Sequence, residues 1–146
     1  MKRYQIALAM GMTFIASLAY GHVRIQPRES PLGARQTYTV VVPTEGVSAT
    51  TSVELEVPDG VSVLSVSGSA ETKKIGNRIV SILWAVEIPP SQARELVFEA
   101  MNPNSGQEIV WKAHQHFMDG SRSDWVEIPA TSRRPAPITK LGASKP

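Results

Sequence analysis

The sequence predicts an all-β domain, a sandwich or barrel of about eight strands at roughly ten-residue spacing. Two observations lead to this fold class. Apolar and polar side chains alternate in short segments separated by turn residues, and no sustained helical period follows residue 21. The 146 residues also include 11 prolines, which disfavour long helices because an interior proline removes a hydrogen bond and clashes with the preceding turn.

Each predicted strand is bounded by its own turn signal. The first ends near a Pro-Leu-Gly turn, the second is β-branched and ends at a proline, and Asp59-Gly60 predicts a hairpin between the third and fourth. Gly76-Asn77 precedes the fifth, Pro89-Pro90 ends it, and Asp119-Gly120 separates the last two. In order, the strands are expected at residues 23–28, 36–43, 50–58, 61–67, 79–88, 93–100, 108–118 and 124–128.

The inward positions of these strands predict one core. A chain of about 125 residues buries enough surface to fold without cross-links. The expected core residues are Val40, Val42, Val53, Leu55, Val57, Val61, Val63, Ile82, Trp84, Val86, Leu96, Phe98, Val110 and Phe117. Residues 22–130 form the predicted domain, and residues 131–146, with three prolines and few large apolar groups, are predicted to be a flexible C-terminal tail.

The first 21 residues resemble a secretory signal peptide. Lys2 and Arg3 precede an apolar run that is short for a membrane span, and Ala19-Tyr20-Gly21 is a small-x-small cleavage site. We therefore expect cleavage after Gly21, a mature start at His22 and a periplasmic protein without a transmembrane anchor. An uncleaved N-terminal anchor or a buried helix is the alternative.

Cleavage changes the charge of the protein. The full chain has 15 basic and 13 acidic residues, and removal of Lys2 and Arg3 leaves 13 of each. Electrostatic attraction to a phosphate backbone then has no visible basis, so nucleic acid is not an expected partner. The absence of cysteine excludes disulfides, zinc fingers, iron–sulfur clusters and cysteine nucleophiles.

His22 is the first candidate metal ligand because of its position. An N-terminal histidine offers its free α-amine and its imidazole Nδ1, which together form a six-membered chelate ring. The α-amine loses its proton readily near neutral pH, and nitrogen ligands with an oxygen in one plane suit Cu(II). The alternative is that cleavage merely leaves a histidine there.

A carboxylate is expected to supply the oxygen ligand beside His22, and the third predicted strand, residues 50–58, offers two candidates. Glu54 and Glu56 lie on its polar face, where plain solvated residues are also common. His114 and His116 share one face of another strand and can meet one ion, although two surface histidines are the alternative. Trp84 and Trp111 are expected in the core, whereas Trp125 can face either way.

These motifs together resemble the YcnI-like family of exported bacterial proteins. The resemblance rests on residues 22–29 (HVRIQPRE), 31–33 (PLG), 53–61 (VELEVPDGV), 111–115 (WKAHQ), 119–121 (DGS) and Trp125, and extends from His22 to about Pro129. It implies a β-sandwich related to immunoglobulin-like and cupredoxin-like folds. It further implies a mono-histidine brace for Cu(II) and copper handling beside CopC- and CopD-type proteins.

The resemblance also implies roles for individual residues. His22 is expected to supply two nitrogens, Glu54 an oxygen with Glu56 as the neighbouring alternative, and Trp125 a side chain close to the metal. No family role is implied for His114 or His116. The expected function is a copper carrier or chaperone that is not an enzyme. The alternatives are a non-metal interaction module of the cell envelope and a copper-dependent oxidative enzyme, which uses a second histidine in its brace.

Overall fold

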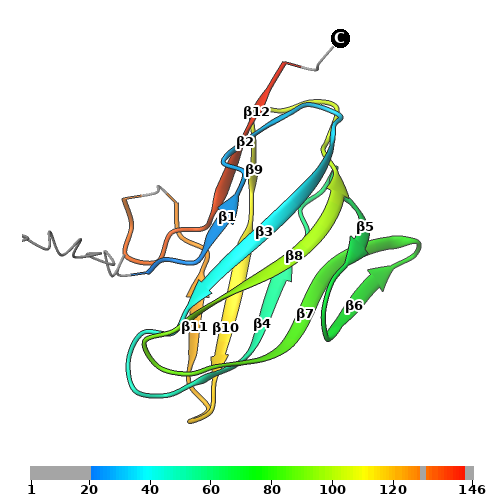
Figure 1. The fold of residues 1–146 in the computed structure, drawn as a ribbon. Coiled ribbons are helices and arrows are strands. Elements are labelled where there is room, and N and C mark those ends of the chain that lie inside the picture. The colour runs from blue at the N-terminus through cyan, green and yellow to red at the C-terminus, as the bar shows by residue number, and fades with distance from the viewer. Residues whose placement is uncertain (1–20, 129–130, 144–146) are drawn as a thin grey trace, which may run out of the picture.

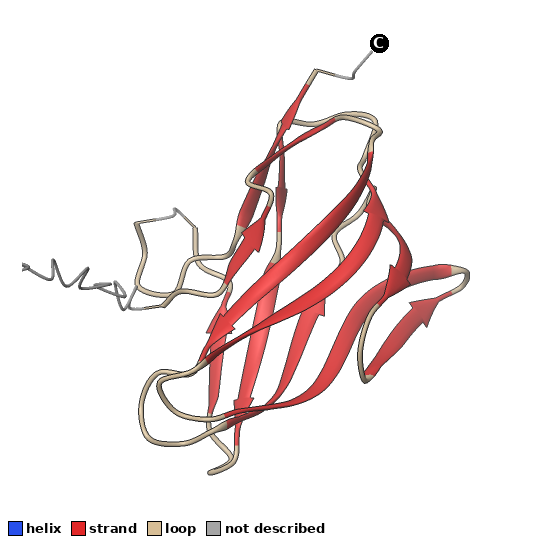
Figure 2. Ribbon diagram, in the orientation of Figure 1, coloured by secondary structure: helices blue, strands red, loops and turns tan. Residues whose placement is uncertain are grey.

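A computed structural model describes residues 21–128 and 131–143. Within these residues the chain forms strands joined by loops, and Figure 2 shows no helix among them. The all-β prediction is confirmed, although the described residues contain twelve strands in place of about eight. The predicted signal peptide, apart from Gly21, lies outside the described residues.

Two antiparallel sheets pack face to face, and a small third sheet lies at one end of the sandwich (Figure 1). The first sheet has the order β1 (Arg24–Gln26), β3 (Arg35–Pro43), β8 (Ala93–Met101), β5 (Ser62–Val66). The second has the order β11 (Arg122–Trp125), β10 (Lys112–Phe117), β4 (Thr50–Glu56), β7 (Arg78–Ile88), β6 (Ala70–Ile75). The third has the order β2 (Glu29–Pro31), β12 (Ile138–Gly142), β9 (Glu108–Val110).

The core lies between the two large sheets. Alternate residues of each strand point inward, so Val40 and Phe98 of the first sheet meet Leu55 and Trp84 of the second, all of them buried. Most of the predicted core is confirmed. The exceptions are residues that are only partly buried, namely Val63, Val86, Val110 and Phe117.

The predicted strand 108–118 divides at Trp111. The Trp111 backbone N–H donates to the carbonyl of Pro137 at 2.8 Å, outside the ladder of the second sheet. Residues before this point form β9 in the third sheet, and residues after it form β10 in the second. Because the chain changes sheet here, the inward positions are Ile109 and Trp111 rather than Val110.

The predicted hairpin at Asp59-Gly60 is wrong, because β4 and β5 belong to different sheets. Gly60 has a φ of +86°, and a Cβ built on it would lie 2.9 Å from Cβ of Pro103. The tight turn therefore carries the chain across the sandwich and packs against the segment after β8, instead of joining neighbouring strands.

The prediction of a flexible tail from residue 131 is also wrong for residues 138–142. These form β12, which pairs in parallel with β2 and antiparallel with β9. Thr139 in this strand is fully buried, and its hydroxyl accepts a hydrogen bond from the indole of Trp111 at 3.1 Å. Pairing on both sides orders a segment whose own composition looks like that of a tail.

Candidate metal centre

His22 and Trp125 lie side by side. His22 is exposed and precedes β1, whereas Trp125 ends β11 and is 6% exposed. Their ring centroids are 5.7 Å apart, with an angle of 53° between the ring planes. Val23 and Ile25 are buried, which fixes the start of β1 against the core and leaves the His22 side chain at the surface. The structure thus brings together two of the three residues that the resemblance selects.

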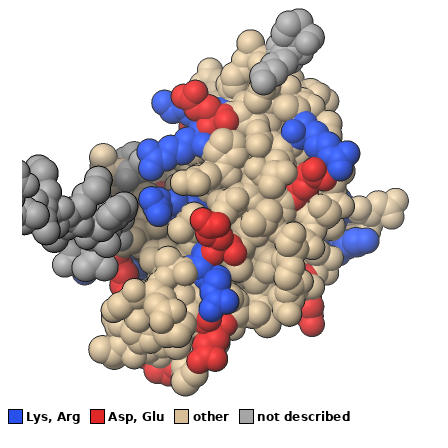
Figure 3. All heavy atoms as spheres, in the orientation of Figure 1, with Lys and Arg blue, Asp and Glu red and all other residues tan. Residues whose placement is uncertain are grey.

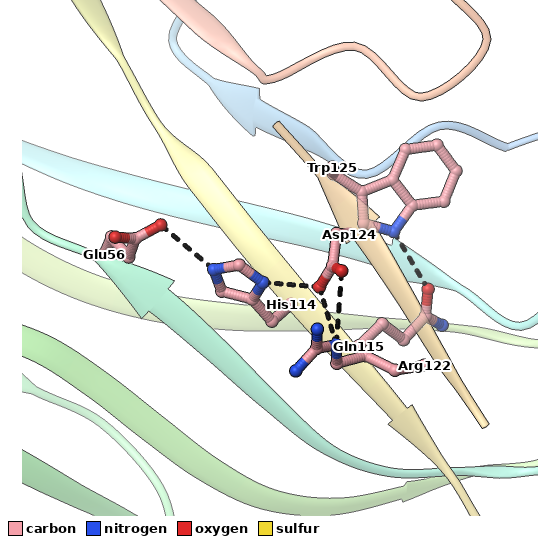
Figure 4. A network of polar contacts seen from close by, with 6 residues as sticks. All are labelled: Glu56, His114, Gln115, Arg122, Asp124 and Trp125. Carbon is pink, nitrogen blue, oxygen red and sulfur yellow. Dashed lines mark hydrogen bonds and ion pairs between the residues drawn. The ribbon is translucent and has the colours of Figure 1, made fainter. Parts of the chain in front are cut away.

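A buried glutamine holds Trp125 in place. The Trp125 indole N–H donates to Oε1 of Gln115 at 3.2 Å (Figure 4). The Gln115 amide donates in turn to the Pro43 carbonyl at 2.9 Å and to Oγ1 of Thr50 at 2.7 Å. Gln115 therefore joins Trp125 to both ends of the loop between β3 and β4.

That loop places a carboxylate beside the start of the domain. The Gly21 backbone N–H donates to Oε1 of Glu45. Glu45 and Trp125 also line one groove of about 320 Å³, with Ser48 and Arg134. The arrangement follows from the pairing of β1 with β3, in which Arg24 lies opposite Val41. Continued backward along β1, this antiparallel register brings residues 21 and 22 beside the end of β3 and the loop that follows.

Sequence reasoning missed Glu45. Only the pairing of strands places Glu45 there. Glu45 lies two residues beyond Pro43 and approaches the mature N-terminus because β1 pairs with β3. Alternation along one strand predicts which face a residue takes, but it does not predict which strands are neighbours.

Glu54 and Glu56 lie away from His22. Leu55 pairs with Ala113, and Ala113 with Trp125, so these three side chains share the core face of the second sheet. The glutamates on either side of Leu55 project from the opposite face. The structure therefore does not bring Glu54 or Glu56 together with His22, in contrast to the sequence-based expectation.

His114 is held between two carboxylates on that outer face. Its Nδ1 lies 2.6 Å from Oδ1 of Asp124, and its Nε2 lies 3.0 Å from Oε2 of Glu56 (Figure 4). Partial burial alone lowers the pKa of His114, but the hydrogen bonds to Asp124 and Glu56 outweigh it and raise the pKa above 6.5. The His114 hydrogen bond also lowers the pKa of Asp124.

His114 and His116 share one face of β10, as predicted. Both ring nitrogens of His114 are engaged, and His116 lies opposite Ser52 and Arg122 on the neighbouring strands. In residues 21–128 and 131–143, no group of three or more His, Asp or Glu side chains is arranged to hold a metal ion. The same residues contain no helix long and apolar enough to cross a bilayer.

Comparison with known proteins identifies relatives. The family described as "Domain of unknown function (DUF1775)" matches residues 66–141. The chain is 32% identical over 127 residues to the copper-binding protein CutI of Bacillus subtilis (strain 168), a match that covers 82% of this chain and 62% of that protein. The chain therefore spans less than two thirds of the length of this relative.

A solved structure supports the fold. An uncharacterized protein from Nocardia farcinica, whose crystal structure reveals an immunoglobulin-like fold, superposes with a TM-score of 0.71 at 23% identity, over 84% of this chain and 99% of that one. This likeness confirms the immunoglobulin-like sandwich. Because the family match covers more than half of the sequence, the chain belongs to the DUF1775 family, and the YcnI-like resemblance is confirmed.

Proposed function

We propose that this protein is an exported copper carrier that binds Cu(II) at His22 after cleavage between Gly21 and His22. Support comes from the contact between His22 and Trp125, from the carboxylate of Glu45 beside Gly21, and from the copper-binding relative. Copper is the cargo of the protein and takes no part in catalysis. The expected compartment is the periplasm, and CopC- and CopD-type proteins are the proposed partners.

The proposed donors are two nitrogens and one oxygen. His22 supplies its α-amine and imidazole Nδ1, and Glu45 supplies a carboxylate oxygen. Before cleavage that carboxylate accepts from the backbone N–H of Gly21, one residue from the nitrogen that cleavage would free. Nitrogen and oxygen ligands in one plane favour Cu(II), which also has the highest affinity in the divalent series.

Trp125 forms one wall of the proposed site. Its indole is nearly buried, and its N–H is already satisfied by Gln115, so the ring presents an apolar surface toward His22. Such a surface limits solvent access to a metal and fixes the orientation of a neighbouring ligand. Trp125 therefore orients the imidazole of His22 and does not coordinate copper.

Exposure of His22 suits a carrier. The chain has no cysteine, and its mature part retains only Met101 and Met118 as sulfur donors, so soft ligands for Cu(I) are scarce. A site formed by one exposed residue and one loop carboxylate leaves a side of the metal open to a partner. Reduction to Cu(I) is expected to weaken binding, because the remaining donors are hard.

Copper titration followed by EPR tests the proposal, with intact mass first establishing that the mature chain begins at His22. His22→Ala is expected to weaken Cu(II) binding by about 100-fold, and Glu45→Gln by about tenfold. Glu54→Gln is the matched control, since Glu54 lies on the opposite face, and should bind as the wild type does.

Two results would overturn the proposal. The first is a mature start elsewhere, which removes the chelating amine. The second is a Cu(II) affinity equal to that of the wild type in His22→Ala, or in a mature chain with one additional glycine before His22, which takes the free α-amine away from His22. Loss of Cu(II) affinity in Glu54→Gln but not in Glu45→Gln would identify Glu54 as the oxygen ligand and refute the role of Glu45.

A further inference from the structure

A second groove, which Glu45 does not line, borders His22. It has a volume of about 280 Å³ and is lined by His22, Arg24 and Arg28 on one wall and by Pro135 and Pro137 on the other. Figure 3 shows several basic side chains on this side of the molecule, with acidic side chains among them.

Both arginines of this groove are exposed, and within the described residues neither forms an ion pair. Three other arginines are paired, Arg35 with Glu99, Arg78 with Asp59, and Arg122 with Asp124, whereas Arg94, Arg133 and Arg134 form no ion pair within the described residues either. Two unpaired guanidinium groups beside one small groove give a local positive charge that binds carboxylates well, because a guanidinium offers a planar pair of donors.

The proposed copper site adds to this charge. Cu(II) with a neutral amine, a neutral imidazole and one carboxylate keeps one positive charge, and three donors leave one position of a tetragonal plane open. An incoming anion would relieve the excess charge by binding copper and would lower the repulsion from Arg24 and Arg28.

We propose that the groove lined by His22, Arg24 and Arg28 binds a small dicarboxylate, one end of which takes the open position on Cu(II) while the other pairs with the arginines. This inference rests on the proposed copper site. The small volume of the groove favours a free metabolite-sized anion over a segment of folded protein. Copper would then enter or leave the carrier as a ternary complex with that anion.

Succinate is a suitable probe because it binds free Cu(II) weakly and carries two carboxylates. Addition of succinate to the Cu(II)-loaded mature protein is expected to shift the EPR and visible spectra at lower concentration than acetate does, and neutral succinamide should have no effect. Arg24→Gln/Arg28→Gln is expected to weaken succinate binding by about tenfold and to remove its advantage over acetate.

The arginine variant is expected to lose succinate affinity but not Cu(II) affinity, so the two measurements separate the groove from the copper site. In buffer without a coordinating anion, loss of two positive charges should leave Cu(II) affinity unchanged or raise it a few-fold, because repulsion is reduced. Lys73→Gln/Lys74→Gln is the matched control. It removes two exposed charges from β6, at the edge of the second sheet opposite β11, and should match the wild type in both measurements.

Several outcomes would overturn the inference. The first is equal succinate binding by the wild type and the arginine variant. The second is a loss of succinate binding in the lysine variant as large as that in the arginine variant. The third is a spectral shift with a polyglutamate peptide but none with succinate, which would indicate an acidic partner protein. Normal Cu(II) binding without any response to succinate refutes the groove alone. Absence of Cu(II) binding by the wild type refutes the proposed function as well.

Discussion

The indole nitrogen of Trp125 lies 3.2 Å from Oε1 of Gln115, and this bond joins the wall of the proposed copper site to the interior of the sandwich. Gln115 is 1% exposed, and its amide donates to Pro43 and Thr50 on the other side. One side chain therefore sets both the orientation of Trp125 and the ends of the loop that carries Glu45.

Replacement of Gln115 by leucine is expected to destabilise the domain by about 2 kcal/mol, since it leaves the Trp125 N–H and the Pro43 carbonyl without a partner. Urea denaturation measures the loss. Gln107→Leu changes an exposed glutamine in the same way and should cost less than about 0.5 kcal/mol. Equal stability of the two variants would contradict a structural role for the Gln115 bonds.

Truncation after residue 130 is expected to lower the melting temperature strongly, because it removes β12. The third sheet would lose its central strand, and the Trp111 indole would lose its bond to Thr139. Thermal unfolding followed by tryptophan fluorescence checks this outcome. Truncation after Gly142 is the control and should leave the melting temperature within a few degrees of that of the full domain. An unchanged melting temperature after the longer truncation would show that β12 contributes nothing.

The contacts of His114 predict a stability that falls as pH rises. Because the folded-state pKa of His114 is raised, its contribution is complete below the unfolded value of about 6.5 and is lost as pH rises through the folded value. Asp124, whose pKa is lowered, has its effect at acid pH. Its contribution to stability is present above its unfolded-state pKa of 3.8 and is lost as pH falls through its folded-state pKa.

His114→Gln should therefore cost more stability at pH 5.5 than at pH 8.5, as measured by urea denaturation at both pH values. His116→Gln is the control on the same face of β10, because His116 forms no ion pair within the described residues. A difference between wild type and His114→Gln that stays constant across this range would refute the contribution of the charged imidazole.

Gly60→Ala is expected to destabilise the protein by about 2 kcal/mol. The residue has a φ of +86°, and an added Cβ would lie 2.9 Å from Cβ of Pro103. Gly76→Ala provides a matched comparison, since Gly76 has a φ of +61° but no atom within 4 Å of an added Cβ. Its cost should be about 1 kcal/mol, from backbone strain alone. Equal losses in a urea titration would show that the contact with Pro103 is unimportant.

Local pattern predicted the fold class and most of the core. Alternation in residues 50–58 placed Val53 and Leu55 inward correctly, because a half-buried strand shows its two faces in its own sequence. Strand pairing left no such signal. The turn at Gly60 looks like a hairpin but connects two sheets, and β12 is a strand because β2 and β9, both distant in sequence, lie on its two sides.

The candidate site was predicted in part for the same reason. His22 and Trp125 were selected correctly as neighbours, whereas Glu54 was chosen from its strand without knowledge of the face that Trp125 takes. Trp125 proved to face the core, so a carboxylate on the solvent face of β4 lies on the other side of the sheet. Glu45 emerged only from the pairing of β1 with β3.

The burial at the start of β1 has a consequence for the timing of maturation. Gly21 and Val23 are both buried, and Gly21 is bonded to the loop between β3 and β4. A peptidase needs an accessible chain on both sides of the bond it cuts, and in the folded sandwich the backbone of Gly21 is buried, although His22 is exposed. Cleavage at the proposed position therefore has to come before β1 docks, so the order of processing and folding decides whether the amine of His22 is ever freed.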